Sequence, residues 1–160
     1  MNLHKKYKYL FNSDCRYYVV TGGRGSGKSF SVTVFLTLLT MAKGFRVLFT
    51  RYTMVSAHLS IIPEFLEKIG LLGLDNIFSI NKSEVVNTAT KSDIIFKGIK
   101  TASGNQTASL KSLQGVSCWV LDEAEELVDE DIFDTIDLSI RQKGVQNRIV
   151  LILNPTTKEH

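Results

Sequence analysis

Apolar residues form two kinds of pattern along the chain. Four short runs are rich in β-branched or aromatic residues and end in polar residues or glycine, which is typical of buried strands. They lie at 17–22, 45–51, 117–126 and 148–155. Apolar residues at helical spacing predict three helices, at 28–42, 55–69 and 129–141. Strands that alternate with helices favour an α/β fold: a mostly parallel sheet with helices on both faces.

Each predicted helix has its own end signals. The first is apolar almost all round and is ended by Gly44, so we expect it to be buried on most sides. Pro63 interrupts the second helix, which is therefore either kinked or begins late. Three acidic residues suit the positive end of the third helix, and Arg141 and Lys143 suit its other end.

The middle of the chain has a different character. Residues 76–99 form short strand-like runs separated by polar turns, which predicts a small antiparallel insertion or sheet edge. Residues 100–115 are polar, rich in small side chains and without periodicity, so we expect a loop there.

Composition narrows the class of protein. The chain has 160 residues, 44% hydrophobic and 22% charged, which indicates one globular domain with a sizeable core. The net charge of +3 permits contact with a polyanion but does not by itself indicate one. No run approaches the ~18 apolar residues that a membrane helix needs. Cys15 and Cys118 are expected to be buried free thiols in a reducing compartment, and the protein to be cytosolic.

The first predicted strand leads into a glycine-rich turn. Gly22, four further residues, Gly27, Lys28 and Ser29 fit the phosphate-binding loop G-x-x-x-x-G-K-[ST]. In such a loop, backbone N–H groups surround a phosphate, the lysine bridges the outer phosphates and the hydroxyl holds Mg²⁺. The predicted nucleotide-binding residues of this turn are Gly22, Gly23, Arg24, Gly25, Ser26, Gly27, Lys28 and Ser29.

A dinucleotide fingerprint is the rival interpretation of this turn. Gly23 and Gly25 begin the pattern G-x-G-x-x-G, but Lys28 stands where the third glycine is needed. The second strand also ends in Arg51 and not in the acidic residue that a ribose would require. The phosphate-binding loop therefore fits better.

Polar residues close two other predicted strands. Asp122 follows an apolar run and could hold a metal ion, and the adjacent Glu123 could polarise an attacking water. Glu125 and Glu126 fit a solvated acidic surface. Asn154 and Thr156 follow the last strand and could sense a γ-phosphate, although an Asn-Pro turn alone would explain them. Ligands bind at the carboxyl ends of parallel strands, so we expect all three strand ends to meet in one crevice.

Four segments together resemble a known family. "GGRGSGKS", "VLFTR", "SLQGVSCWVLDEAEE" and "LILNPT" are similar, in this order, to the ATPase half of viral large terminase subunits, which package DNA into phage capsids. The resemblance implies a P-loop NTPase of the ASCE type that uses ATP and Mg²⁺ to translocate double-stranded DNA. It implies a homo-oligomeric ring in the host cytoplasm, transiently on a procapsid, with the portal protein and the small terminase subunit as partners.

The resemblance also implies roles for single residues. Asn154–Thr156 would be the coupling motif between hydrolysis and movement, and Arg24 would reach the phosphates in cis. Lys111 stands where some terminases present a trans-acting arginine, with Arg141 and Arg148 as weaker rivals for that role. A monomer of this fragment is then expected to bind ATP but to hydrolyse it poorly. Segment 100–115 is a candidate for contact with DNA, and a plain solvated loop is the alternative.

Two departures from the family pattern matter. Terminase large subunits normally continue into an RNase H-like nuclease domain, whereas this sequence ends at His160. We therefore expect residues 1–160 to be an ATPase domain, either excised from a longer chain or belonging to a protein that lacks the nuclease. The family often has a glutamine ahead of the phosphate loop for the adenine, and residues 1–20 contain none. Tyr9, Phe11 and Arg16 could contact the base instead, or could simply pack.

Functions of other classes remain as alternatives. A nucleotide-binding switch with little turnover would not need the carboxylate of Glu123. A helicase-like ATPase would usually need a second, similar domain, and a kinase would need an acceptor pocket. DNA-stimulated hydrolysis would separate the motor from the switch.

Overall fold

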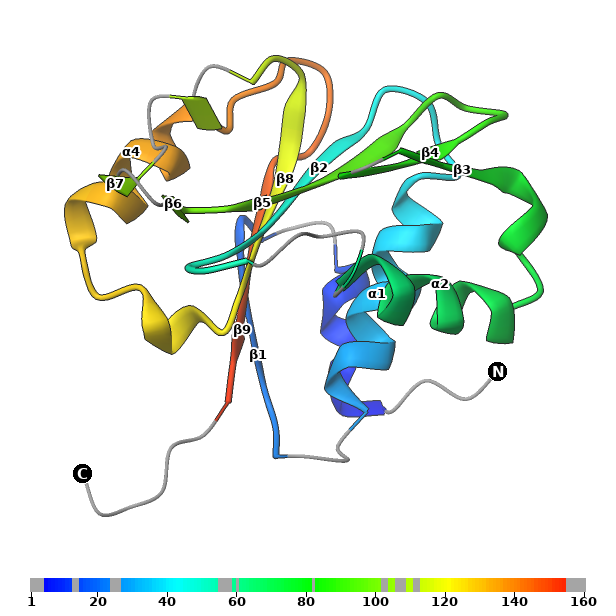
Figure 1. The fold of residues 1–160 in the computed structure, drawn as a ribbon, viewed down its shortest axis with the longest axis horizontal. Coiled ribbons are helices and arrows are strands. Elements are labelled where there is room, and N and C mark those ends of the chain that lie inside the picture. The colour runs from blue at the N-terminus through cyan, green and yellow to red at the C-terminus, as the bar shows by residue number, and fades with distance from the viewer. Residues whose placement is uncertain are drawn as a thin grey trace.

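The computed structural model describes residues 5–12, 15–23, 27–54, 59, 61–81, 83–101, 104–105, 109–110 and 113–154. The helical elements are η1 (Lys5–Phe11), α1 (Lys28–Leu39), α2 (Ile61–Leu71), η3 (Asp75–Ile77), η4 (Ala124–Glu126) and α4 (Glu130–Ser139). The strands are β1 (Tyr17–Thr21), β2 (Arg46–Arg51), β3 (Phe78–Asn81), β4 (Glu84–Asn87), β5 (Asp93–Gly98), β6 (Lys100–Thr101), β7 (Gly104–Asn105), β8 (Val116–Asp122) and β9 (Arg148–Leu153). Figure 1 shows their arrangement.

Within the described part of the chain, seven strands form one sheet in the order β1-β9-β8-β2-β5-β4-β3. The pairings from β1 to β5 are parallel, and β4 and β3 add to the edge as antiparallel strands. The predicted mostly parallel sheet with a small antiparallel insertion is therefore confirmed. One strand of the middle segment, β5, belongs to the parallel part, because it pairs with β2.

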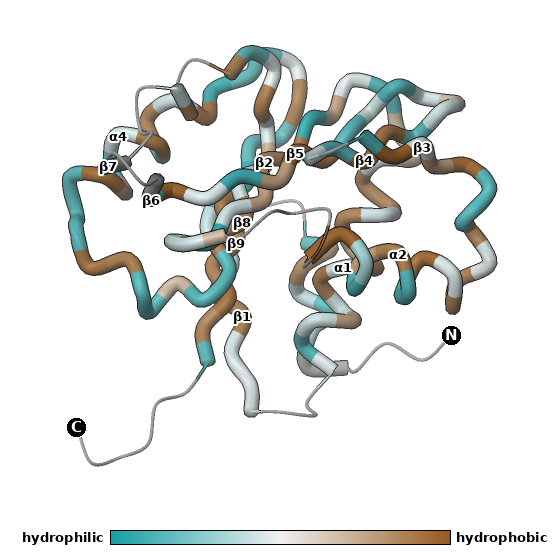
Figure 2. Tube along the Cα trace, viewed as in Figure 1, coloured by the Kyte–Doolittle hydropathy of each residue, from teal (hydrophilic) through white to brown (hydrophobic). Residues whose placement is uncertain are grey.

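Helices cover both faces of the sheet, as predicted (Figure 1). η1, α1 and α2 pack over one face, and α4 packs over the other. Side chains of β2 alternate between the two cores: Val47 and Phe49 face α1 and α2, whereas Leu48 faces α4. Apolar positions run along the central strands in Figure 2, because helices cover these strands on both faces of the sheet.

The helix ends refine the sequence interpretation. α1 begins after Gly27, whose φ of 81° lies in the left-handed region that glycine adopts without steric cost. It ends at Leu39, earlier than predicted, and Gly44 (φ 87°) then completes the turn into β2. α2 begins at Ile61, so Pro63 sits in its first turn and breaks no hydrogen bond. Of the two alternatives for this helix, the late start is the one observed.

Two expectations about the chain were wrong. Segment 100–115 is not only a loop, because β6 and β7 pair within it and Leu110 is buried under α4. Cys118 is buried as expected, and burial raises the pKa of its thiol to about 12. Cys15, however, is exposed.

None of the helices among the described residues is long and apolar enough to cross a membrane.

Candidate active site

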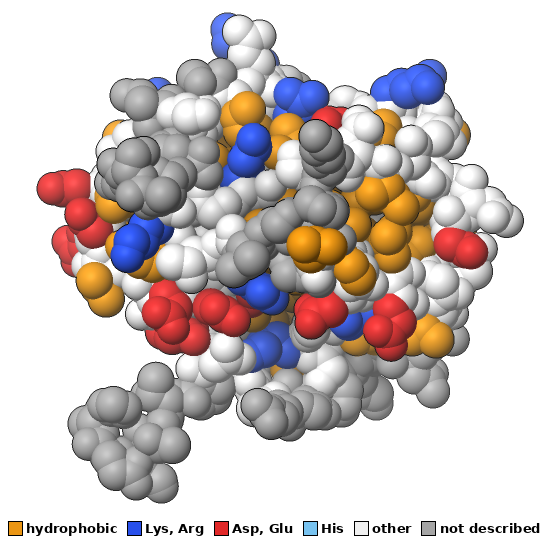
Figure 3. Space-filling model, in the orientation of Figure 1, with side chains coloured by type: hydrophobic (Ala, Val, Ile, Leu, Met, Phe, Trp, Pro, Cys, Tyr) orange, Lys and Arg blue, Asp and Glu red, His pale blue; other side chains and the backbone are white. Residues whose placement is uncertain are grey.

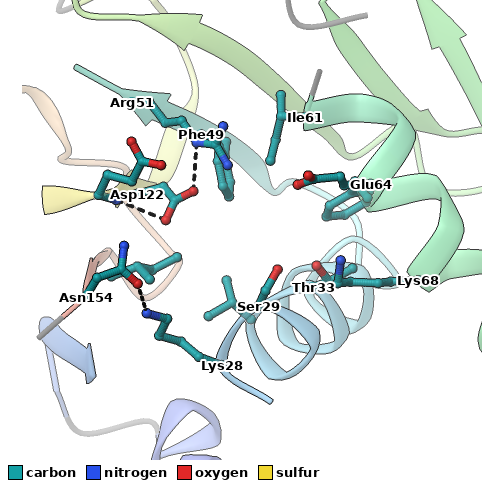
Figure 4. Close-up of a pocket in the computed structure, with 14 residues that line it drawn as sticks. Lys28, Ser29, Thr33, Phe49, Arg51, Ile61, Glu64, Lys68, Asp122 and Asn154 are labelled. Carbon is teal, nitrogen blue, oxygen red and sulfur yellow. Dashed lines mark hydrogen bonds and ion pairs between the residues drawn. The ribbon is translucent and has the colours of Figure 1, made fainter. Parts of the chain in front are cut away.

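Three strand ends meet at one edge of the sheet. β1, β9 and β8 are neighbours in the sheet, so their carboxyl ends lie side by side (Figure 1). Lys28, Ser29, Asp122, Glu123 and Asn154 line one cavity of about 180 Å³ at this edge (Figure 4). The predicted crevice therefore forms, although its residues come from positions more than 120 apart in the sequence.

Lys28 reaches across the site from the first turn of α1. Its Nζ donates to the backbone oxygens of Gly22, at 3.0 Å, and Leu153, at 3.2 Å, and to Oδ1 of Asn154. These three oxygens hold the ammonium group between Gly22 and the end of β9, and Figure 4 draws the contact with Asn154. Gly27 has no side chain that could cap α1, and the positive end of such a helix attracts anions.

Asp122 ends β8 and has a partner for each carboxylate oxygen. Oδ2 accepts from Nε of Arg51 at 2.9 Å, and Oδ1 accepts from the backbone N–H of Glu123 at 3.0 Å. Arg51 lies directly opposite Asp122 because β2 and β8 pair in that register. Sequence reasoning used Arg51 only to exclude a dinucleotide site and missed this contact.

A buried polar link fixes β2 to β8 beneath that ion pair. The indole N–H of Trp119 donates to the Thr50 hydroxyl at 2.9 Å, and this hydroxyl donates to the backbone oxygen of Val120 at 2.9 Å. Trp119 and Thr50 are both fully buried. A satisfied buried network of this kind holds the two strand ends in a single relative position.

Glu123 has an unusual backbone conformation. Its φ of 52° and ψ of 48° are left-handed, which costs a non-glycine residue about 1–2 kcal/mol. The chain turns sharply here from β8 into η4, and the Glu123 side chain lines the cavity beside Asp122. Such strain is typical of functional positions, where the surrounding structure maintains it.

Glu125 is part of the site, contrary to the prediction that it belongs to the solvated run. Its Oε1 accepts from the backbone N–H of Asn154 at 3.2 Å, and its Oε2 accepts from Nδ2 of Asn154 at 3.4 Å. Glu126, the next residue, is exposed, as predicted. No local pattern distinguishes the two glutamates, because the difference depends on how η4 packs against β9.

The cavity continues between α1 and α2. Thr33 of α1 and Ile61, Phe65, Glu64 and Lys68 of α2 line its far side, opposite Asp122 (Figure 4). The sequence analysis did not include these residues in the site, although the spacing of Glu64 and Lys68 puts them on the same helix face as Ile61 and Phe65. In Figure 3, a row of acidic side chains with some Lys and Arg between them crosses the molecular face below its middle.

Several predicted site residues lie outside the described residues. These are Arg24, Gly25 and Ser26 of the glycine turn, Lys111 of the loop before β8, and Thr156 after β9.

Each of the three candidates for adenine contact has a partner within the chain. Arg16 precedes β1 and so lies at the opposite edge of the sheet, where it bonds Asp137 at 2.7 Å and the backbone oxygen of Ile140 at 3.1 Å. The Tyr9 hydroxyl donates to the backbone oxygen of Val19, and Phe11 packs edge-on against Phe35.

The two weaker candidates for a trans-acting cation differ in their surroundings. Arg148 is buried at the start of β9, over the ring of Phe35. Arg141 is exposed just after α4.

Known proteins share this fold. The large terminase of a thermophilic bacteriophage superposes with a TM-score of 0.73 at 12% identity, over 97% of this chain and 40% of that one. The large terminase ATPase domain of Thermus phage P74-26 gives 0.68 at 16% identity, over 97% of this chain and 66% of that one. The N-terminal domain of the DNA packaging ATPase of bacteriophage phi29 gives 0.67 at 15% identity, over 98% of this chain and 80% of that one.

Sequence comparison points to the same group of proteins. The large terminase subunit of Bacillus phage SPP1 is 26% identical over 122 residues, which are 72% of this chain and 28% of that protein. The chain therefore spans well under half the length of the SPP1 protein and of the thermophilic phage terminase. The profile of the family described as phage terminase large subunit matches residues 14–160. The chain belongs to the phage terminase large subunit family.

Proposed function

We propose that this chain binds and hydrolyses ATP as the motor part of a phage DNA-packaging terminase. One observation carries the proposal: the lysine and serine of the phosphate-binding loop share a cavity with Asp122, Glu123 and Asn154. Relatives of the same fold support it. The large terminase of the thermophilic bacteriophage has been solved with ADP and with ATP-γ-S, and a phi29 protein has been solved in its genome packaging motor assembly.

In this proposal, Lys28 leaves its three oxygen partners to bind the outer phosphates. Such an exchange costs little, because the charge keeps strong acceptors in both states. The glycine turn, Gly22 to Gly27, and the first N–H groups of α1 surround the same phosphates. Arg24, outside the described residues, adds a cation in cis.

The residues present fit Mg²⁺. The Ser29 hydroxyl and the Asp122 carboxylate are hard oxygen donors on the same cavity, and each Asp122 oxygen accepts one of the two hydrogen bonds described above, which leaves it a further lone pair. Ser29 and Asp122, the latter through water or directly, would therefore hold the ion, which neutralises charge on the transferred phosphoryl group.

Glu123 is the proposed general base. Its side chain lines the cavity next to Asp122, at a place where it can orient and polarise an attacking water. A nucleotide-binding switch has no need of this strained carboxylate, so its position favours hydrolysis over mere binding. Asn154, and Thr156 outside the described residues, would sense the γ-phosphate.

Activity on DNA would require more than one chain. The partners in this proposal are double-stranded DNA, the portal protein and the small terminase subunit, with the chain in a homo-oligomeric ring on the procapsid in the host cytoplasm. Lys111, outside the described residues, would supply a cation to the neighbouring subunit. In mixed assemblies, a Lys111→Ala subunit should then rescue a Glu123→Gln subunit.

The first experiment removes the phosphate-binding cation. Lys28→Ala should weaken ATP binding in the presence of Mg²⁺ by at least about tenfold, because a charge-assisted contact to the outer phosphates is lost. Lys43→Ala makes the same charge change in the exposed turn after α1 and is the control. Equal affinity of wild type and Lys28→Ala in a nucleotide titration would exclude the assigned loop. Hydrolysis that double-stranded DNA fails to stimulate in the full-length protein would exclude the motor.

A further inference from the structure

Asn154 lies between a cation and an anion. Its Oδ1 accepts from the Lys28 ammonium, while its Nδ2 and its backbone N–H donate to the two carboxylate oxygens of Glu125. A side-chain amide has an acceptor end and a donor end, so these neighbours permit only one orientation. If the amide were rotated by half a turn, N–H groups would face the ammonium and the amide oxygen would face the carboxylate.

We propose that Glu125 is a positioning residue that fixes the Asn154 amide for recognition of the γ-phosphate, the outermost phosphate of a nucleoside triphosphate. This inference rests on the proposed function. Its substance is a chain of three contacts that runs from η4 through the end of β9 to the first turn of α1.

The location of Glu125 supports this role. η4 follows Glu123 directly, and the left-handed backbone at Glu123 turns the chain so that η4 contacts the end of β9. The backbone N–H of Glu126 donates to the oxygen of Glu123 at 2.9 Å, which closes that turn. The proposed general base and the positioning carboxylate therefore belong to the same turn of backbone, two residues apart.

A bound outer phosphate would alter this chain of contacts at its centre. Lys28 would transfer from Asn154 to the phosphate, and the amide would lose the donor that faces its oxygen. Glu125 would then still hold the donor end of the amide and keep Asn154 beside the phosphate. A diphosphate has no γ-phosphate, the group beside which Asn154 is held, so Glu125 should affect triphosphate binding and leave diphosphate binding unchanged.

The test compares triphosphate and diphosphate affinities. Glu125→Ala should lower the ratio of ATP-γ-S affinity to ADP affinity about tenfold, the order expected for a hydrogen bond to a charged group. Glu125→Gln keeps one acceptor oxygen and should retain part of that ratio. Glu126→Ala makes the same change at the exposed neighbouring position and should leave the ratio at the wild-type value. A ratio that is equal in Glu125→Ala and Glu126→Ala would overturn the proposal.

A double-mutant cycle shows whether Glu125 acts through Asn154. Once Asn154→Ala has removed the amide, the further change Glu125→Ala should have no effect on the ratio. Additive effects of the two substitutions would mean that Glu125 acts by another route, and would overturn the proposal.

A measurement without nucleotide separates this inference from the proposed function. In the free protein, hydrogen exchange at the Asn154 backbone N–H should be faster in Glu125→Ala than in wild type and unchanged in Glu126→Ala, because Glu125 accepts from that group. If this exchange is unchanged, the positioning role fails even when ATP binds. If the wild-type protein does not bind ATP-γ-S, the proposed function fails, whatever the exchange result.

Discussion

β2 carries an arginine at each end, and each arginine pairs with an aspartate directly opposite on a neighbouring strand. At the amino end, Arg46 pairs with Asp93 of β5; at the carboxyl end, Arg51 pairs with Asp122 of β8. The two pairs have the same chemistry and belong to the same strand. They differ in how completely each carboxylate is held by its arginine.

The pair at the amino end is closed. Arg46 donates from Nε and Nη2 to the two oxygens of Asp93, both at 3.1 Å, and from Nη1 to the backbone oxygen of Gln114. The Asp93 side chain is only 6% exposed. A fork that uses both carboxylate oxygens leaves little for any other ligand, so this pair serves the fold.

The pair at the carboxyl end is open. Arg51 Nε binds one oxygen of Asp122, the other oxygen binds the backbone of Glu123, and the carboxylate lines the cavity with Lys28. The Asp122 side chain is 15% exposed. An ion pair alone therefore does not mark a site. What distinguishes Asp122, the carboxylate proposed to bind metal, is that two different groups share its oxygens and that it lines a cavity.

The largest effect should come from the open pair, Arg51 with Asp122, and the adjacent Glu123. Glu123→Gln should keep ATP bound but slow hydrolysis by at least ~10²-fold, the usual contribution of a positioned general base. Asp122→Asn should instead weaken Mg²⁺-dependent binding. Single-turnover hydrolysis and nucleotide titrations separate the two, with Glu126→Gln as the control. If the two phenotypes were exchanged, the roles assigned to Asp122 and Glu123 would be wrong.

The free energy of unfolding should depend more on the closed pair, Arg46 with Asp93, than on the open pair. Asp93→Asn should lower the free energy of unfolding by about 1–2 kcal/mol, less than a fully buried pair would lose because Arg46 is partly exposed and screened. Asp122→Asn should cost less, and Asp134→Asn on the exposed face of α4 is the control. Urea unfolding measures all three. A greater loss in Asp122→Asn than in Asp93→Asn would contradict the distinction between the edges.

The Mg²⁺ dependence of ATP binding should respond only to changes at the open pair, Arg51 with Asp122. Arg51→Gln removes a cation from Asp122, so the Mg²⁺ concentration for half-maximal ATP binding should fall about threefold. Arg141→Gln, an exposed position beyond α4, should leave that concentration unchanged. A rise in the Mg²⁺ requirement of Arg51→Gln would show that Arg51 supports the bound state instead of competing with the ion.

The smallest effect concerns the pH dependence of thermal stability beside the closed pair, Arg46 with Asp93. Burial, together with the neighbouring Asp93 carboxyl, raises the pKa of Glu84 above its ordinary value of 4.5. A group with a raised pKa stabilises the fold while it is protonated, and that contribution is lost as the pH rises through the folded-state pKa. Glu84→Gln should therefore raise Tm by about 1 °C at neutral pH, and this difference should vanish at about pH 4.

The control for this prediction is Glu67→Gln on the exposed face of α2. Thermal unfolding followed across the pH range measures both variants. A Tm difference for Glu84→Gln that grows toward acid pH would contradict the assigned direction of the pKa shift.

Sequence alone predicted the architecture, and the structure agrees. The alternation of strands and helices is encoded locally, because periods of two residues and of 3.6 residues differ within a few positions. The predicted phosphate-binding loop is equally local, because Gly22, Gly27, Lys28 and Ser29 lie within eight consecutive positions of the sequence.

Tertiary structure decided what each polar residue contacts. Arg51 and Asp122 are 71 residues apart, and Glu125 and Asn154 are 29 apart. No periodicity could show that Glu125 faces β9 while Glu126 faces solvent, or that Arg16 lies at the edge away from the cavity. A polar residue after a strand is equally compatible with water and with a partner. Only the pairing of β8 with β2 and β9 brings Glu125 of η4 and Arg51 at the end of β2 into the site, because those contacts depend on strand register and not on neighbouring residues.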